Sequence, residues 1–274
     1  MSILEAIVLG ILQGFTEFLP ISSSGHLRIF PAFFGWEDPG AEFTAVVQLG
    51  TMVAELVFFR KDLWNIGRNW VLSLRRPELR STLEARMGWY LVFATVPISI
   101  LGLLFEDDIE SELRALEIIG TTLIVLGLVL LVADRVGKRE RGIQELTLRD
   151  GLVMGLAQSL ALVPGVSRSG ATITAGLFLG LDRAAAARFS FLLSIPAVVL
   201  SGLYQLASFV TGDVRGDSGA AALIVATLLA FVCGYAAISF LLRYLATHTM
   251  LVFVGYRVVL GAVVLALAAT GVIR

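Results

Sequence analysis

Two short polar stretches stand out in a chain that is otherwise apolar. They are FTEFLPISSSGHLRIF at residues 15–30 and LVPGVSRSGAT at residues 162–172. Their carboxylate, hydroxyl, imidazole and guanidinium groups can move protons, attack as nucleophiles or bind anions. Both stretches therefore indicate a site of polar chemistry. The candidate residues are Glu17, Ser22, Ser23, Ser24, Gly25 and His26 in the first stretch, and Ser167, Arg168, Ser169, Gly170 and Thr172 in the second.

Each stretch contains a serine cluster followed by a glycine. Serine is a preferred residue at helix N-caps, and glycine lets a ligand approach the backbone closely. A helix N-terminus presents free N–H groups and partial positive charge, so two such ends facing each other would form an anion cradle. Arg168 adds a permanent positive charge and a planar set of donors suited to phosphate oxygens. The pattern favours a phosphate-binding site.

Glu17 carries the charge opposite to that of Arg168, and three roles are open to it. It could be a fixed ion-pair partner of Arg168, hold a divalent cation against phosphate oxygens, or accept a proton from a nucleophile. Gln13 lies one helical turn earlier and could offer an amide oxygen to the same cation. Because carboxylates are scarce here, we expect a divalent cation, Mg²⁺ or Ca²⁺, to be bound mainly through phosphate oxygens of the substrate.

His26 and Thr172 each have two interpretations. His26 follows Ser23 at the start of a predicted helix, where an imidazole could act as acid or base. A lone histidine is more often an inert hydrogen-bonded residue, but the neighbouring serines and carboxylate favour catalysis. Thr172 lies one turn into its helix and could donate to a phosphate or bond to its own backbone. His248 lies in a short loop without such neighbours and is interpreted as a structural or interfacial residue.

The composition places these residues in a membrane protein. Of the 274 residues, 57% are hydrophobic and 16% are charged, and the mean hydropathy is +0.86, which is too apolar for an ordinary soluble domain. The formal net charge of −1 leaves no positive excess for a polyphosphate backbone, so we expect no nucleic-acid partner. The lone cysteine, Cys233, excludes a disulfide framework and a cysteine-based metal site.

Helix length separates spanning segments from broken ones. A helix needs about 20 apolar residues to cross a bilayer. The regions at about 3–34 and 150–182 are apolar but interrupted, and each half is too short to cross. Because broken backbone survives in a membrane only beside protein or water, we predict two re-entrant helix–loop–helix hairpins within an all-α polytopic fold. The six predicted transmembrane helices are 42–59, 88–105, 117–134, 186–209, 219–242 and 250–272.

The two broken regions also align with each other without a gap. Within the single predicted membrane domain, 1–274, each internal repeat (about 1–134 and 146–274) would contain one hairpin and three spans. Because three is odd, the second repeat would be inverted relative to the first, an arrangement that forms sites near the membrane midplane. The alignment superposes Glu5 on Asp150, Gly10 on Gly155, Gln13 on Gln158, Ser22 on Ser167, Ser24 on Ser169 and Gly25 on Gly170.

Charge in the connecting segments predicts the orientation. Segments 60–87 and 135–150 carry seven and five Lys or Arg residues, so both are expected in the cytoplasm. Segments 106–116 and 210–218 are acidic or sparse in positive charge, as external loops are. With six spans, both termini are then predicted outside.

The motifs QGFTEFLPISSSGH (13–26) and PGVSRSGAT (164–172) closely resemble those of the bacterial undecaprenyl-diphosphate phosphatase family, also called bacitracin-resistance proteins. The resemblance covers essentially the full length, including EFTAVVQLGT (42–51). It implies an inner-membrane enzyme that removes the terminal phosphate from the diphosphate of a C55 polyprenyl lipid. This reaction would return the monophosphate carrier to cell-wall synthesis.

The resemblance also implies roles for particular residues. Ser23 would be the nucleophile, activated by Glu17 or His26, and a water held by the same groups is the alternative. Many family members have glutamate where this chain has Gln13, which leaves a single carboxylate there. The residues implied in phosphate binding are Ser167, Arg168, Ser169 and Thr172.

Rival functions remain open at this point. A transporter or flippase of a phosphorylated lipid could use the same inverted-repeat cavity, but it gains nothing from a serine, histidine and glutamate cluster. An intramembrane serine protease would not require Arg168. An acid-phosphatase mechanism needs a second histidine, and residues 170–182 contain none. The expected partners are the polyprenyl diphosphate, the lipid bilayer and, in a homodimer, a second copy of the chain.

Overall fold

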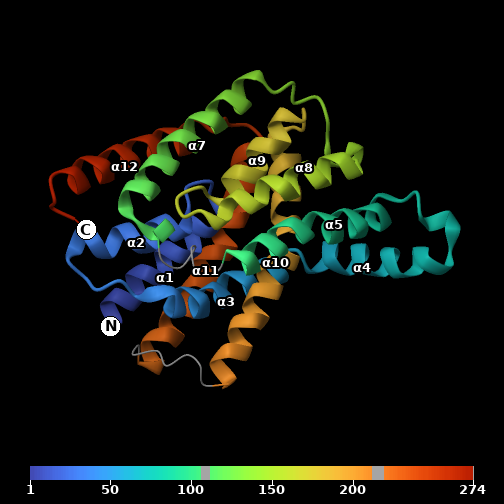
Figure 1. The fold of residues 1–274 in the computed structure, drawn as a ribbon. Helices are drawn as coiled ribbons and strands as arrows, with labels where there is room; N and C mark the ends of the chain where they lie inside the picture. The colour runs from blue at the N-terminus through green and yellow to red at the C-terminus, as the bar shows by residue number, and fades with distance from the viewer. Residues whose placement is uncertain (106–111, 212–218, 274) are drawn as a thin grey trace.

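The computed structural model describes residues 1–105, 112–211 and 219–273 (Figure 1). Within these ranges the chain is almost entirely helical, with an isolated bridge between Arg141 and Leu181. Short 3-10 helices occur at Pro77–Leu79, Glu112–Arg114, Ile143–Glu145 and Leu160–Leu162. The α-helices are α1 (Ile3–Phe18), α2 (Ser23–Phe34), α3 (Gly40–Phe58), α4 (Arg60–Arg75), α5 (Leu83–Leu104), α7 (Leu116–Val136), α8 (Leu148–Ser159), α9 (Arg168–Phe178), α10 (Arg183–Thr211), α11 (Ala220–Leu245) and α12 (Leu251–Ala269).

The predicted all-α, multi-pass class is confirmed, with five to six helices able to span a membrane. By length and hydropathy α5, α7, α10, α11 and α12 qualify singly among the described residues, whereas α3 qualifies only together with α4 across a 70° bend. The predicted external segments 106–116 and 210–218 lie largely outside the described residues. By length and composition, the described residues therefore offer five or six candidate spans.

The segment 60–87 is not simply a connecting loop, as the sequence suggested, because it contains helix α4. One side of α4 packs along α5, where the indole of Trp70 lies against Gly88 and meets the ring of Trp89 at 5.4 Å. Figure 1 shows the two helices side by side. The sequence does not predict this helix, because a segment rich in Lys and Arg indicates a solvated connection as readily as one face of an amphipathic helix.

The two interrupted regions break where the sequence predicted. Helix α1 ends at Phe18 and α2 begins at Ser23. Helix α8 ends at Ser159, a 3-10 turn follows, and α9 begins at Arg168. Each region is thus a helix–break–helix unit, and we call residues 19–22 the first break and residues 160–167 the second break.

Both units begin with a helix that packs closely on a long helix from the other half of the chain. Helix α1 packs on α11, and α8 packs on α5. A Cβ atom at Gly10 would lie 2.5 Å from the carbonyl oxygen of Ala226, and one at Gly155 would lie 2.4 Å from that of Ala94. Glycine is needed at both positions because the backbones approach closely.

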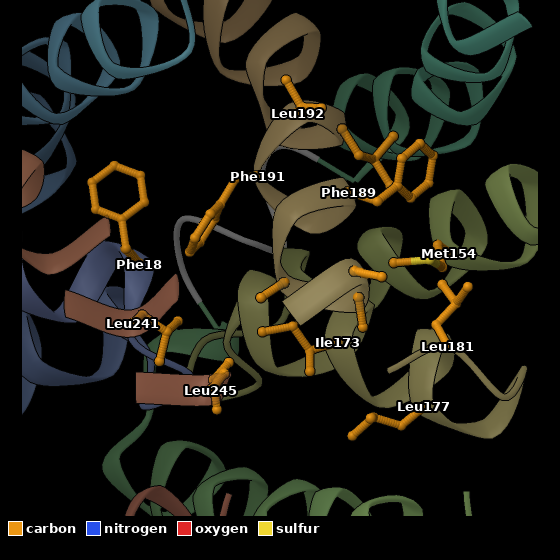
Figure 2. Close-up of a cluster of buried hydrophobic side chains, with 14 of the residues drawn as sticks. Phe18, Met154, Ile173, Leu177, Leu181, Phe189, Phe191, Leu192, Leu241 and Leu245 are labelled. Carbon is orange, nitrogen blue, oxygen red and sulfur yellow. The ribbon is translucent and has the colours of Figure 1, made fainter. Parts of the chain in front are cut away.

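A shared apolar core lies beside the breaks (Figure 2). Phe18, at the end of α1, meets Phe191 of α10 edge to face with ring centroids 5.7 Å apart. Ile173 and Leu177 of α9 lie in the same buried cluster. The last turn of α1 and the helix after the second break are therefore held by one core.

Candidate active site

Two serines cap the helices that follow the breaks, as predicted. The Ser22 hydroxyl accepts a hydrogen bond from Gly25 N at 3.4 Å, and the Ser167 hydroxyl accepts one from Gly170 N at 3.1 Å. Both serines have positive φ, 74° and 71° respectively, a conformation uncommon outside glycine and costly to maintain. The matched geometry turns the chain sharply into each helix and directs both N-termini toward polar neighbours.

Glu17 is the centre of the polar cluster. Its Oε2 accepts hydrogen bonds from Ser23 Oγ at 2.6 Å and from Gln13 Nε2 at 3.1 Å. Its Oε1 accepts from Arg168 Nη2 at 2.9 Å. The ion pair with Arg168, one of the three roles left open for Glu17, is therefore present, and the same carboxylate also contacts the serine hydroxyl.

A second bond joins the two units. Ser169 Oγ donates to the carbonyl of Leu19 at 3.2 Å. Within each unit a pair of hydroxyls also lies at 3.3 Å, Ser22 with Ser24 and Ser167 with Ser169. The two breaks therefore converge on one site.

Burial indicates how the site is reached. Ser24 is exposed, and Ser23 and Arg168 are partly exposed. Ser22 and Ser169 are buried. An anion would therefore reach the cluster from the side of Ser24 and meet the hydroxyl of Ser23 and the guanidinium before the deeper capping groups.

His26 is fully buried and has partners away from Glu17. Its Nδ1 lies 2.6 Å from the carbonyl of Ser22, and its Nε2 lies 2.6 Å from the hydroxyl of Tyr256. Because a carbonyl only accepts, Nδ1 carries a proton, and in the neutral ring Nε2 accepts from Tyr256. The ring supports the first break in this arrangement, and an acid–base role for His26 stays a prediction.

Thr172 is fully buried, as His26 is. Its hydroxyl is 2.9 Å from the carbonyl of Arg168 and 2.5 Å from Ser190 Oγ. These bonds tie α9 to its own first turn and to α10. The described contacts match the backbone-bonding interpretation, and phosphate binding by Thr172 stays a prediction.

Arg257 is a buried site residue that the motifs did not reveal. It lies on α12, is fully buried, and donates to carbonyls of both breaks, those of Pro20, Gly165 and Val166. The available signal was one arginine within the apolar run 250–272. A charge at such depth is rare and marks function by default.

Glu55 is a second residue that the motifs missed. It lies on α3, is buried, and its Oε1 accepts from Ser194 Oγ at 2.6 Å. It is close enough to Arg168 and Glu17 to interact electrostatically with both. The signal was a carboxylate in the interior of the predicted span 42–59, whose other carboxylate, Glu42, lies at its first position.

The donor set allows a cation only with help from a ligand. The described residues contain no group of three or more His, Cys, Asp or Glu side chains able to hold a metal. The side-chain oxygen of Gln13, Oε1, is buried and has no hydrogen-bond partner. The amide nitrogen of the same side chain donates to Glu17. One amide oxygen and one carboxylate suit a hard cation that draws its other ligands from phosphate and water.

The fold and the site together describe a helical membrane protein whose two broken helix pairs meet at one polar cluster. The family model described as bacitracin resistance protein BacA matches residues 6–263. The chain belongs to this family.

Close relatives extend over nearly the whole chain. An undecaprenyl-diphosphatase of Nocardioides sp. is 59% identical over 270 residues, covering 98% of each chain. Undecaprenyl-diphosphatases of Thermobifida fusca and Mycolicibacterium smegmatis are 52% and 54% identical over 275 residues. They align with all of this chain, which covers 92% and 99% of their respective lengths.

Proposed function

We propose that this chain is an integral membrane phosphatase that hydrolyses undecaprenyl diphosphate to undecaprenyl phosphate and inorganic phosphate. The reaction would recycle the lipid carrier for peptidoglycan and other cell-wall polymers. The observation that carries the proposal is the Glu17 carboxylate, which bonds to the Ser23 hydroxyl and pairs with Arg168 from the other unit. A general base, a nucleophile and a phosphate-binding cation thus meet at one point.

The first step is attack by Ser23 Oγ on the terminal phosphorus. The hydroxyl proton passes to Glu17, which already accepts its hydrogen bond. The bond from the terminal phosphorus to the bridging oxygen breaks, and undecaprenyl phosphate leaves with that oxygen. Water then attacks the phosphoserine phosphorus, and the bond from phosphorus to Ser23 Oγ breaks. Inorganic phosphate departs with the oxygen and both hydrogens of the water, and the proton held by Glu17 returns to Ser23 Oγ. Direct attack by a water bound to Glu17 is the alternative within the same site.

Arg168 and the helix N-termini supply the charge stabilisation. Phosphoryl transfer depends mostly on positioning and on neutralising the equatorial oxygens. Arg168 is released from Glu17 when the diphosphate replaces the carboxylate as its partner. The free N–H groups of α2 and α9 would contact the same anion.

A divalent cation, Mg²⁺ or Ca²⁺, completes the proposed site. Glu17 and Gln13 would hold it, together with the substrate diphosphate. When bound, it would neutralise phosphate charge as a Lewis acid. The unpartnered oxygen of Gln13 supports this assignment.

The membrane arrangement is also part of the proposal. We place the chain in the bacterial inner membrane as one domain, with residues 60–87 and 135–150 in the cytoplasm and both termini outside. The two helix–break–helix units would be re-entrant hairpins of an inverted repeat. Their matched caps, and the packing of each first helix on the other half, support this arrangement. The prenyl tail would remain in the bilayer, and a homodimer is compatible with the site.

The direct test is phosphate release from a C55 diphosphate by the purified protein, with and without a chelator. Wild type should release phosphate, and Ser23→Ala, Arg168→Ala and the chelator should each suppress it. His26→Ala should lower turnover less, because its ring bonds to Ser22 and Tyr256. His248→Ala and Arg243→Ala are matched controls, since both residues are exposed and bond within their own segments.

The same assay separates the phosphatase from a transporter. Transbilayer movement of the lipid without phosphate release would reject the phosphatase and favour a flippase. Undiminished turnover by Arg168→Ala would reject the proposed anion cradle.

A further inference from the structure

Arg257 touches both breaks at once, from a helix outside either unit. We propose that Arg257 is a positioning residue, which sets the distance between the nucleophile of the first unit and the phosphate-binding arginine of the second. This inference rests on the proposed phosphatase function. It assigns a role in that reaction to a residue far from both motifs.

The guanidinium is satisfied by backbone carbonyls. Nη1 donates to Pro20 O at 3.3 Å, and Nη2 donates to Gly165 O at 3.1 Å and to Val166 O at 3.0 Å. Further bonds run from Nε to Leu123 O and from Nη2 to Thr122 O. The fork therefore bridges the first break, the second break and helix α7.

Only arginine has the donors for this bridge. Its five N–H groups lie in one plane on a rigid fork, whereas a lysine ammonium is a compact point charge with three donors. A lysine at this position could serve carbonyls of one break and leave those of the other without a partner. The positive charge would persist, but the spacing between the breaks would no longer be set.

Gly170 gives independent support. A Cβ atom at this position would lie 2.8 Å from Arg257 Nη1 and 3.1 Å from Ser167 Cβ. The sequence suggested that this glycine admits a ligand to the backbone. The structure shows a second cause, since the guanidinium occupies the space in which a side chain would lie.

The neighbouring residue of α12 contacts the first unit as well. Tyr256 OH lies 2.6 Å from His26 Nε2, and the two rings stack with centroids 5.5 Å apart. Two consecutive residues of α12 thus support the first break. Arg257 bonds to it directly at Pro20, and Tyr256 does so through His26, which bonds to Ser22. Helix α12 itself packs along α7 (Figure 1).

The bridged carbonyls lie next to the reacting groups. Pro20 lies midway between Glu17 and Ser23, and Val166 lies two residues before Arg168. A change in the separation of the breaks therefore moves Ser23 relative to the arginine that holds the phosphate. A misplacement of about 1 Å can cost about 10²-fold in rate even when substrate still binds.

The experiment compares Arg257→Lys, Gly170→Ala and the double variant in phosphate release from the C55 diphosphate. Kcat and KM are expressed per folded protein, with folded protein measured by size exclusion and thermal unfolding. Arg243→Lys and Gly67→Ala are matched controls, because Arg243 bonds within its own helix and a Cβ at Gly67 would meet no atom within 4 Å.

We expect each single variant to lower kcat by about 10- to 10²-fold, with a smaller change in KM, because the diphosphate still binds while the attack geometry is lost. The double variant should be little worse than Arg257→Lys, since both changes displace the same guanidinium. Both controls should keep the wild-type kcat.

Three results would overturn the proposal: an unchanged kcat per folded protein for Arg257→Lys, an unchanged kcat for Gly170→Ala, or losses that multiply in the double variant. If Arg257→Lys does not fold, Gly170→Ala decides, because its methyl group would displace the same guanidinium. A wild type that releases no phosphate would instead reject the proposed function, so the two failures are distinguishable.

Discussion

The two helix–break–helix units share one backbone design but carry different chemistry. Each opens with a capping box, formed by Ser2 with Glu5 in the first unit and by Thr147 with Asp150 in the second. In each, a serine with positive φ caps the helix after the break. A glycine also lies against a long helix of the other half, Gly10 in α1 and Gly155 in α8.

The chemistry differs at the aligned positions. Leu162 takes the place of Glu17, Arg168 that of Ser23, and Ala171 that of His26. The first unit thus carries the proposed base and nucleophile, and the second carries the arginine proposed to bind phosphate. The similar backbone of the two units provides two helix N-termini. The side chains of one unit are proposed to attack the phosphate, and those of the other are proposed to bind it.

The largest expected effect comes from removing the carboxylate of the first unit. Glu17→Gln should lower kcat by about 10²- to 10⁴-fold, the range for loss of a general base. Leu162→Gln, which places the same residue at the aligned position of the second unit, should have little effect. Phosphate release measures both. Equal losses would mean that the two units do not divide the chemistry as described.

Replacing Arg168, the positively charged side chain of the second unit, should have the next largest effect. Arg168→Lys keeps the charge but loses the planar fork, so we expect about 10- to 10²-fold lower kcat/KM, less than full removal of a stabilising donor costs. Arg149→Lys, at an exposed position of α8, is the control. Wild-type kinetics for Arg168→Lys would show that point charge suffices and that fork geometry is not used.

The shared design can be tested at its two close-packed glycines. A methyl group at Gly10 or Gly155 would meet backbone atoms, which cannot rotate away. Gly10→Ala and Gly155→Ala should each lower the free energy of unfolding by about 1–3 kcal/mol. Thermal unfolding in detergent measures this, with Gly67→Ala as control. A loss at one glycine and none at the other would argue against equivalent packing.

The smallest expected effect is on the free energy of unfolding, and it comes from the capping box of the second unit. Burial would raise the pKa of Asp150, but hydrogen bonds from Arg141 and Thr147 outweigh it and lower that pKa. The interaction therefore stabilises the fold above the ordinary aspartate pKa of about 3.9 and is lost as pH falls through the lowered value.

Asp150→Asn should accordingly flatten the loss of stability below about pH 4 and lower the free energy of unfolding at neutral pH by about 1 kcal/mol, because the side chain of Arg141 is partly exposed. Glu5→Gln should lower the free energy of unfolding at neutral pH less, since Glu5 bonds to Ser2 near the exposed start of the chain. Unfolding profiles from neutral to acid pH provide the measurement. A steeper acid transition in Asp150→Asn than in wild type would contradict the sign.

Local signals were sufficient for the breaks and their caps. Serine clusters followed by glycine, flanked by apolar segments too short to span, predicted where the two regions are interrupted and that a serine of each cluster caps the helix that follows. Pairing of Glu17 with Arg168 was among the roles that the opposite charges suggested, although the sequence alone did not select it. These inferences rest on neighbouring residues or on one obvious charge match.

Tertiary contacts were beyond the same reasoning. Arg257 and Glu55 lie in apolar runs far from either motif, and nothing local shows which carbonyls or hydroxyls they reach. The reason for glycine at position 170 was likewise hidden, since it depends on a guanidinium from α12. Helix α4 was missed because cationic residues on its exposed face outweighed the apolar face that packs on α5.

The most direct test is an experimental structure of the Ser23→Ala variant with the C55 diphosphate bound. The account predicts one diphosphate between the breaks, with its terminal phosphate in contact with Arg168 and beside position 23, and with Glu17 released from the arginine. A diphosphate bound to one unit only, or breaks that lie apart with packed helices between them, would contradict it.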